Sequence, residues 1–419
     1  MRFAIRVDRL IDGTGSAPTR GAAILIDEDT ILDAGPVERV GIPADWPVVD
    51  APGCTALPGL IDCHVHIANS GDPHQTWDTS YLRDDTGLLA LKGYVYANHD
   101  LEAGFTTVRD MGARSYVNIA VRDAVECGLV TGPRIVACGL PLCSTGGHFD
   151  RVGLTTGNTM SDYAAIVDSP DAARASVREQ FKRGADFIKI AIDGRLPSSF
   201  HPRSTQLQEL SAAELRAICE TVHEAGRKVA AHTDGGPGMC DAIRAGIDSL
   251  EHLQGFTEEE MALIAEHGVI LVPTLTATKC TVDNGVMPQV PERLRAKALQ
   301  WMVRNWKDKQ AGMKRALAAG VRIALGTDAG YTNCLHGQNA YELGLFVQEG
   351  MTPMQAIVAA TSTAAECVRL GDSVGTLRKG YLADILLVEG DPLKDIAILR
   401  RPERLKAIYK DGRLVKSSL

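Results

Sequence analysis

The sequence lacks an uninterrupted apolar run of about 18 residues, the minimum that a membrane-spanning helix needs. Its first segment, MRFAIRVDRLIDGTG, carries a charge every few residues and has no apolar stretch followed by a small-residue cleavage site. We therefore expect a protein that neither spans a membrane nor is exported. The cytoplasm is the simplest compartment for it.

Positive charge is also in short supply. The 44 Lys and Arg residues are outnumbered by 52 Asp and Glu residues, the formal net charge is −8, and no block of basic residues stands out. Proteins that bind nucleic acids neutralise phosphates with clustered Lys and Arg side chains. We therefore expect no nucleic-acid partner.

The cysteines follow no recognisable framework. Ten are scattered along the chain without CxxC spacing. A disulfide-rich fold or a thiolate metal site would show regular or paired spacing. We expect buried or reduced thiols instead.

What the sequence does contain is typical of a large globular enzyme-sized chain. Apolar residues make up 45% and charged residues 23% of 419 residues, so a sizeable core can be buried. An α/β barrel takes roughly 250 residues as one unit. One barrel plus a smaller domain accounts for the length.

Most of the chain alternates short β-branched runs with longer helical patterns, which is typical of βα units and a parallel sheet. Glycines such as Gly104, Gly184 and Gly226 precede the strands, as expected where helices end. We predict an α/β fold, a (β/α)8 TIM-like barrel. Its eight strands are expected at residues 59–64, 106–109, 134–137, 187–190, 228–232, 249–252, 269–273 and 323–328.

Two end regions read as β structure without intervening helices. Residues 22–27 and 30–34 at the front, and residues 383–388 and 405–412 at the back, are short apolar runs separated by turn residues. Ends that share this pattern can share one sheet. We predict that residues 1–56 and 375–419 form one composite β-sandwich domain and that residues 57–374 form the barrel.

Three helix starts carry recognisable capping signals. Ser211 with Glu214, and Thr257 with Glu260, have the spacing of a capping box. Thr352 is followed by proline, which suits the first helical position. Helices are therefore expected to begin directly after these residues.

Polar residues sit at or near the carboxyl ends of several predicted strands, where barrels of this kind build their active sites. His64 and His66 lie two residues apart, so a strand turns both toward the same side and they can chelate one metal. His232, His252 and Asp328 end three further strands. Each alone could be a hydrogen-bonded structural residue or a helix cap, but their joint placement favours a metal site.

Lys189 lies inside the apolar run Phe187-Ile188-Lys189-Ile190, where an unpaired ammonium group would cost several kcal/mol. It could extend its amine to water past the end of the strand. Alternatively, a neutral amine could capture carbon dioxide and become a carbamate whose two oxygens bridge two cations.

These features resemble the amidohydrolase superfamily over nearly the whole chain. The resemblance is carried by Pro58-Gly59-Leu60-Ile61-Asp62-Cys63-His64-Val65-His66, Lys189, His232, His252, Gly326-Thr327-Asp328, Lys379-Gly380-Tyr381-Leu382-Ala383-Asp384 and Lys410-Asp411-Gly412-Arg413. The segments at 103–110 and 144–148 look like the branch of metal-dependent dipeptidases, prolidases and imidazolonepropionase-like proteins.

The resemblance implies a two-metal site. His64, His66 and Asp328 would hold one divalent ion, His232 and His252 would hold the second, and N6-carboxylated Lys189 would bridge them. Zinc is the expected metal, although imidazole and carboxylate also suit other divalent ions. Similar proteins are oligomers, so a homo-oligomer is expected.

Two such cations would share a water and lower its pKa, which supplies hydroxide to attack an amide carbonyl. Asp328 is the candidate catalytic base that accepts the proton and returns it to the leaving nitrogen. His148, in a glycine-rich loop after the third strand, is the candidate donor to the developing oxyanion. Tyr331 and His336 follow Asp328 closely enough to line the pocket, without a role that the sequence assigns.

The substrate is expected to be a small molecule with an amide-type C–N bond, such as a dipeptide or an N-acyl amino acid. Prolidase-like proteins carry an aromatic residue just after the fifth-strand histidine, whereas this chain has Thr233 and Asp234 there. A carbamate, urea or cyclic amide therefore stays an alternative. A mononuclear deaminase would lack Lys189, and a catalytically silent scaffold would have lost ligands.

Overall fold

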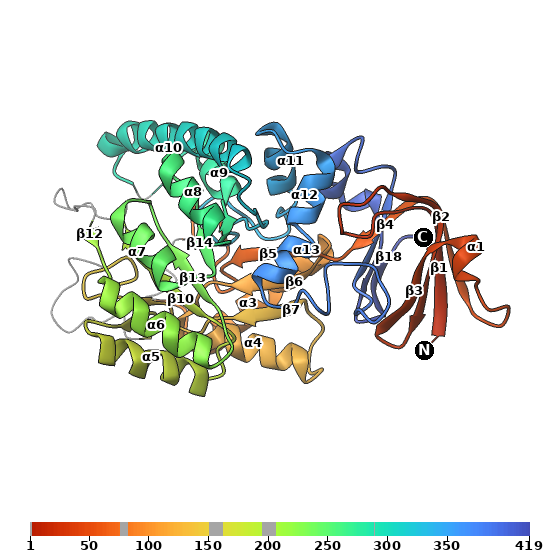
Figure 1. The fold of residues 1–419 in the computed structure, drawn as a ribbon, viewed down its shortest axis with the longest axis horizontal. Helices are drawn as coiled ribbons and strands as arrows, with labels where there is room; N and C mark the ends of the chain where they lie inside the picture. Colours follow the sequence, from red (N-terminus) through yellow and green to blue (C-terminus); the bar gives the residue numbers. More distant parts are fainter. Residues whose placement is uncertain (1, 76–82, 151–161, 195–206, 289) are drawn as a thin grey trace.

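A computed structural model describes residues 2–75, 83–150, 162–194, 207–288 and 290–419. Strands from both ends of the chain gather at one end of the molecule, and helices surround a set of parallel strands in the rest of it (Figure 1). Within the described ranges, no helix has both the length and the apolar character that crossing a membrane requires.

The two termini share one seven-stranded sheet, as predicted. Its strand order is β18-β17-β16-β4-β1-β2-β3, and β16 pairs antiparallel with β4. Asp411 and Gly412 have φ values of 49° and 69°, which suit the tight turn joining β17 and β18. The sandwich form of this domain stays a prediction. The strands are β1 (Arg2–Leu10), β2 (Thr19–Asp27), β3 (Thr30–Pro36), β4 (Val48–Pro58), β16 (Ile385–Glu389), β17 (Leu405–Lys410) and β18 (Arg413–Ser417).

Seven of the eight predicted inner strands are present and form parallel pairs. One sheet has the order β5-β6-β7, and another contains β15-β14-β13-β10 followed by the short strands β8 and β9. The chain therefore has a mixed α/β fold built on parallel sheets. The strands are β5 (Leu60–Val65), β6 (Phe105–Asp110), β7 (Arg134–Ala137), β8 (Leu142–Cys143), β9 (Ala165–Ile166), β10 (Ile188–Ala191), β13 (Val229–His232), β14 (Ser249–Glu251) and β15 (Ile270–Val272).

The eighth run, residues 323–328, departs from the prediction because it forms isolated parallel bridges rather than a regular strand. Leu271 pairs with Ile323 and Val65 pairs with Ala329, so the run still lies between β15 and β5. The backbone N–H of Thr327 donates to the Asp62 carboxylate, 3.1 Å away, instead of to a neighbouring strand. Asp328 adopts a left-handed φ of 64°, which interrupts the extended backbone between the two bridges.

The two predicted capping boxes are confirmed, and so is the helix start at Thr352, which forms a third box with Pro353 at the first helical position. Ser211, Thr257 and Thr352 each accept a hydrogen bond from the backbone three residues on, and each reciprocal side chain is in place. The helices are α1 (Val37–Val40), α3 (Thr86–Glu102), α4 (Val117–Glu126), α5 (Pro170–Lys182), α6 (Ala212–Glu224), α7 (Pro237–Ala245), α8 (Glu258–Glu266), α9 (Leu275–Asn284), α10 (Glu292–Ala318), α11 (Tyr341–Gln348), α12 (Pro353–Ala359) and α13 (Ser362–Cys367). A further antiparallel pair joins β11 (Asp193–Gly194) to β12 (Leu207–Gln208).

The amino ends of the parallel strands face the terminal sheet. Gly59, just before β5, donates its backbone N–H to the Asp384 carbonyl at 2.9 Å, and Arg134 at the start of β7 pairs with Asp384 at 2.7 Å. The carboxyl ends consequently point away from that sheet, and the candidate site residues lie there. All ten cysteines are free, as expected.

Candidate metal centre

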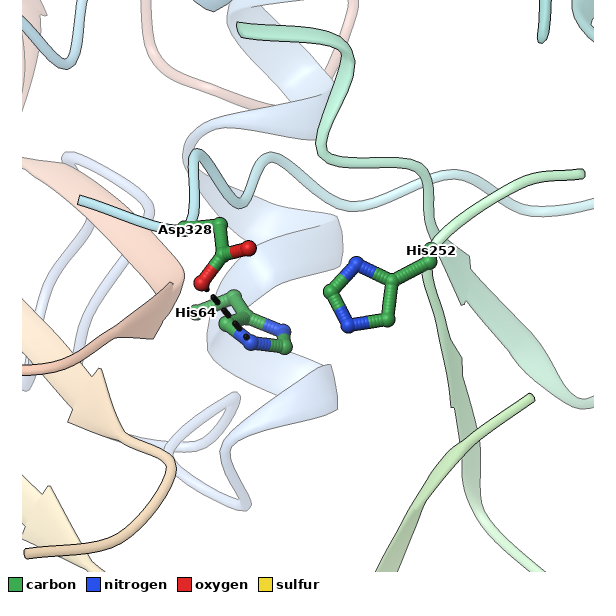
Figure 2. Close-up of side chains that lie close together, drawn as sticks. All are labelled: His64, His252 and Asp328. Atoms are coloured by element: carbon green, nitrogen blue, oxygen red, sulfur yellow. Dashed lines mark ion pairs between the residues drawn. The ribbon is translucent and has the colours of Figure 1, made fainter. Parts of the chain in front are cut away.

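Three of the predicted site residues meet at one point. Ligand atoms of His64, His252 and Asp328 all lie within 4.8 Å of one another, in a group that could hold a metal ion. Nε2 of His64 is 3.6 Å from Oδ1 of Asp328, and the His252 ring faces this pair from the end of β14 (Figure 2). These residues end β5, β14 and the eighth run, which the sequence separates by up to 264 positions.

His66 joins the same group, as the alternation of side chains along a strand predicts. Its Nε2 is 3.4 Å from Oδ1 of Asp328, and its Nδ1 lies 3.3 Å from the Gly112 carbonyl oxygen. A carbonyl oxygen can accept a hydrogen bond but cannot donate one. Nδ1 therefore carries the proton, and Nε2 presents a lone pair. Burial raises the pKa of Asp328, but the nearby His66, His64 and Lys189 outweigh this effect and lower it.

His232 and His148 complete a row of imidazoles. The ring centroid of His232 is 4.6 Å from that of His252 and 3.9 Å from that of His148. Burial lowers the pKa of His232 well below its ordinary value, so the ring is neutral and can act as a ligand at neutral pH. The loop that carries His148 therefore reaches the end of β13, and the role of His148 as a donor stays a prediction.

Lys189 lies on β10, which pairs in parallel with β13, the strand that ends at His232. It is 2% exposed, and within the described part of the chain its Nζ has no hydrogen-bond partner. Burial lowers its pKa to about 8 against the opposing effect of Glu251, and its charge in turn lowers the pKa of His64, His232 and His252. An unpartnered amine among neutral imidazoles and a carboxylate fits the donor set of a divalent metal site.

The three residues whose ligand atoms converge come from both of the predicted ligand sets. His64 and Asp328 belong to one and His252 to the other, yet their ligand atoms converge. Paired cations lie about 3.5–4 Å apart, so their ligands necessarily crowd one another. The sequence allowed each candidate ligand to be placed at the end of a strand. Which ligands lie closest to one another can be read only from the folded structure.

Glu251 contacts the candidate site and was not among the predicted residues. It is fully buried, and its Oε2 lies 2.8 Å from Nδ1 of His64, while Arg109 and Ser249 each donate to its Oε1 at 2.7 Å. Burial opposes ionisation, but Arg109 and His64 lower the pKa of Glu251 to about 2. The carboxylate therefore holds the His64 proton on Nδ1 and leaves Nε2 free toward Asp328. The signal available in the sequence was a charged residue inside an apolar strand, which is also the feature that marked Lys189.

Replacing Glu251 with glutamine is expected to weaken zinc binding by about 10- to 100-fold, the usual cost of losing a partner that orients a ligand. Glutamine keeps the size of the side chain and an acceptor oxygen but removes the charge that faces Arg109. Competition with a chromophoric chelator measures the affinity. Glu220→Gln, at a side chain that is 62% exposed, is the control, and an unchanged affinity in Glu251→Gln would rule out the orienting role.

The backbone is left-handed at three of these strand ends. His252, Thr274 and Asp328 have φ values of 70°, 48° and 64°. Such conformations cost of order 1–3 kcal/mol for residues other than glycine and cluster at functional sites. Thr274, which is β-branched, is the least suited to this conformation. The folded chain therefore accepts strain in order to aim these side chains.

Tyr331 and His336 are both close to Asp328 in sequence but differ in surroundings. His336 is buried, with Nδ1 2.8 Å from Oδ2 of Asp100 and Nε2 3.1 Å from the Asn69 carbonyl oxygen. Both ring nitrogens face acceptors, so this imidazole braces the loop after β5. Burial raises the pKa of Tyr331 to about 12, which keeps its hydroxyl protonated.

Comparisons with known proteins agree with this geometry. The sequence model of the Amidohydrolase family matches residues 55–415. The ochratoxinase of Aspergillus niger is 30% identical over 97% of this chain and 85% of the relative, and the imidazolonepropionase of Symbiobacterium thermophilum is 24% identical over 94% and 90%. A crystal structure described as a Xaa-Pro dipeptidase with bound methionine in the active site has a TM-score of 0.87 and 32% identity, with all of both chains covered. The chain therefore belongs to the amidohydrolase family and is a hydrolase that acts on carbon–nitrogen bonds.

Proposed function

We propose that the chain uses two divalent metal ions, most simply zinc, to hydrolyse an amide-type C–N bond in a small molecule. The observation that carries this proposal is the buried amine of Lys189, which has no hydrogen-bond partner among the described residues and whose charge acts on His64, His232 and His252. A lysine kept there as a simple cation would gain no hydrogen bond in return for its loss of water. As a ligand shared by two metal ions, Lys189 would have a reason to be buried there.

The bridging form is a carbamate. The neutral ε-amine of Lys189 adds to the carbon of carbon dioxide, an N–C bond forms, and one nitrogen-bound proton leaves to give the anion. Its lowered pKa of about 8 makes the neutral amine available near neutral pH. When the ions are bound, His64, His66 and Asp328 would hold one, His232 and His252 would hold the other, and carboxylated Lys189 would serve both.

When bound, such a pair of ions supplies a water of lowered pKa and polarises the scissile carbonyl group. Asp328 performs the proton transfers. Its Oδ1 faces both His64 and His66, so we assign Oδ2 to accept the proton of the attacking water and return it to the leaving nitrogen. His148, packed against His232, is placed to donate a hydrogen bond to the carbonyl oxygen as negative charge develops there.

The segment after β13 bears on the substrate. Asp193 accepts hydrogen bonds from the Thr233 hydroxyl at 2.9 Å and from the Asp234 backbone, which fixes this turn. An acidic side chain at Asp234 favours a cationic or neutral group over a carboxylate by charge complementarity. This observation favours carbamates, ureas and cyclic amides, which stay as the alternative. Dipeptides and N-acyl amino acids remain the first candidates because the similar proteins include an ochratoxinase and a Xaa-Pro dipeptidase.

A hydrolysis screen tests the proposal. Zinc-loaded protein is incubated with dipeptides, N-acyl amino acids, aryl carbamates, phenylureas and ochratoxin, the compound for which the Aspergillus niger relative is named. The expected result is a released amine with two zinc ions per chain, and none with metal-stripped protein. Ammonia release with one metal ion per chain would point to a mononuclear deaminase instead, and an absence of bound metal would point to a silent scaffold.

We also propose the finer architecture expected from the sequence: a (β/α)8 barrel at 57–374, with 1–56 and 375–419 forming a composite β-sandwich, in a homo-oligomer. The hydrogen bonds of Cys63 to Leu325 and of Ala324 to Leu271, at 2.8 Å and 3.0 Å, support closure of the barrel through the eighth run. The shared terminal sheet supports the composite domain.

A further inference from the structure

The ring of His252 is held from behind by a hydroxyl group. Its Nδ1 lies 2.8 Å from Oγ1 of Thr274, the residue that follows β15 with a left-handed backbone. A hydrogen bond at Nδ1 sets the rotation of an imidazole, and so decides where Nε2 points. A hydroxyl can donate or accept, but when Nε2 binds a cation, Nδ1 carries the proton and Oγ1 of Thr274 accepts it. In that state Thr274 has the same relation to His252 that Glu251 has to His64.

Thr274 is itself held by a buried cation. Lys309, from α10, is 2% exposed, and its Nζ donates to the carbonyl oxygens of Pro273 and Thr274 at 2.7 Å and 2.9 Å and to Oγ1 of Thr274 at 3.3 Å. An ammonium group has three protons and no acceptor. All three protons are donated to Pro273 and Thr274, so Lys309 has none left for a substrate. Its contacts hold the segment that follows β15 in place.

A buried carboxylate grips the same segment from the other side. Glu342, on α11, accepts hydrogen bonds from the backbone of Leu275 at 2.8 Å and of Thr276 at 2.7 Å, and from the Thr276 hydroxyl at 2.6 Å. The carbonyl groups of 273–274 thus face a cation and the amides of 275–276 face an anion. Buried charges are expensive to desolvate, so this arrangement is better explained by a need for position than by a gain in stability.

We propose that Lys309 is a positioning residue that acts through Thr274 to aim His252, and thereby sets the affinity of one of the two cation positions. The inference rests on the proposed two-metal function. Because His252 serves one ion and His64 the other, the Lys309–Thr274 pair controls one binding step, whereas Glu251 controls the other. The mechanism uses neither Lys309 nor Thr274 as a reacting group.

The test is a zinc titration of the metal-stripped protein against a competing chelator, resolved into two binding steps. Thr274→Val keeps the β-branched shape but removes the acceptor, and it is expected to weaken one step by about 10- to 100-fold and leave the other within a factor of two. Thr274→Ser retains the hydroxyl and is expected to restore that step. Equal weakening of both steps, or normal binding in Thr274→Val, would overturn the proposal.

A double-mutant cycle links the effect to Lys309. Lys309→Met is expected to weaken the same step, and combining it with Thr274→Val should add little to Thr274→Val alone, because the two residues act in series. Additive losses would show that Lys309 works by another route. Gln310→Ala is the control, since this neighbour on α10 bonds to Glu349 at 2.8 Å, and it should leave both steps unchanged. A wild-type protein that binds fewer than two zinc ions would count against the proposed function itself.

Discussion

Replacing Lys189 with alanine is expected to remove bound zinc and turnover together. Without Lys189 the two cation positions have no carbamate to share. The zinc content should therefore fall from two ions per chain to one or fewer. Turnover should fall by at least about a thousand-fold, because the lowered pKa of a metal-activated water is lost. Elemental analysis gives the zinc content, and the substrate found in the hydrolysis screen gives the rate.

A carbamate on Lys189 has its own signature. Wild-type protein reconstituted with zinc and ¹³C-labelled bicarbonate should show a carbamate carbon resonance that Lys189→Ala lacks. Lys182→Ala is the matched control, because that lysine is 74% exposed and pairs with Glu179 at the surface. Two zinc ions and a normal rate in Lys189→Ala would remove the basis of the bridging assignment.

Lys189 could be singled out from the sequence because a charge inside an apolar strand is costly unless its amine reaches water, and its 2% exposure excludes that alternative. The same reasoning applies to Glu251, in Ser249-Leu250-Glu251-His252, and to Arg109, in a buried strand, yet neither stood out beside the more familiar histidines. Their pairing joins β6 to β14, 142 residues apart, and no spacing within the chain reveals it. Residues that orient a site are found through contacts between strands.

The fold was predictable where local patterns are strong. The capping boxes and seven parallel strands follow from side-chain periodicity and helix signals, which act over a few residues. The eighth run differs because the Asp62 carboxylate, from β5, accepts hydrogen bonds from both the backbone and the side chain of Thr327. The Asp62 side chain thus takes the place of part of the hydrogen bonding between strands. The local propensities of residues 323–328 carry no information about such a contact.

The convergence on Asp328 leads to the second large expected effect. Asp328→Asn keeps the shape of the side chain and one acceptor oxygen, but an amide cannot accept and return a proton. With zinc saturating, kcat is expected to fall by about 10²- to 10⁴-fold, the usual range for a general acid–base group. Zinc content measured on the same samples separates this loss from a loss of metal, since the Oδ1 contacts of Asp328 with His64 and His66 also mark it as a ligand.

The leaving group distinguishes the two roles of Asp328. A poorly leaving alkylamine must be protonated as the C–N bond breaks, whereas a nitroaniline can depart with much less help. If Asp328 delivers that proton, Asp328→Asn should lose about tenfold more activity on an alkyl amide than on the matching nitroanilide, because proton transfer contributes most where the leaving group is most basic. Equal losses on both substrates would restrict Asp328 to binding the metal and activating water, and another group would have to protonate the departing nitrogen.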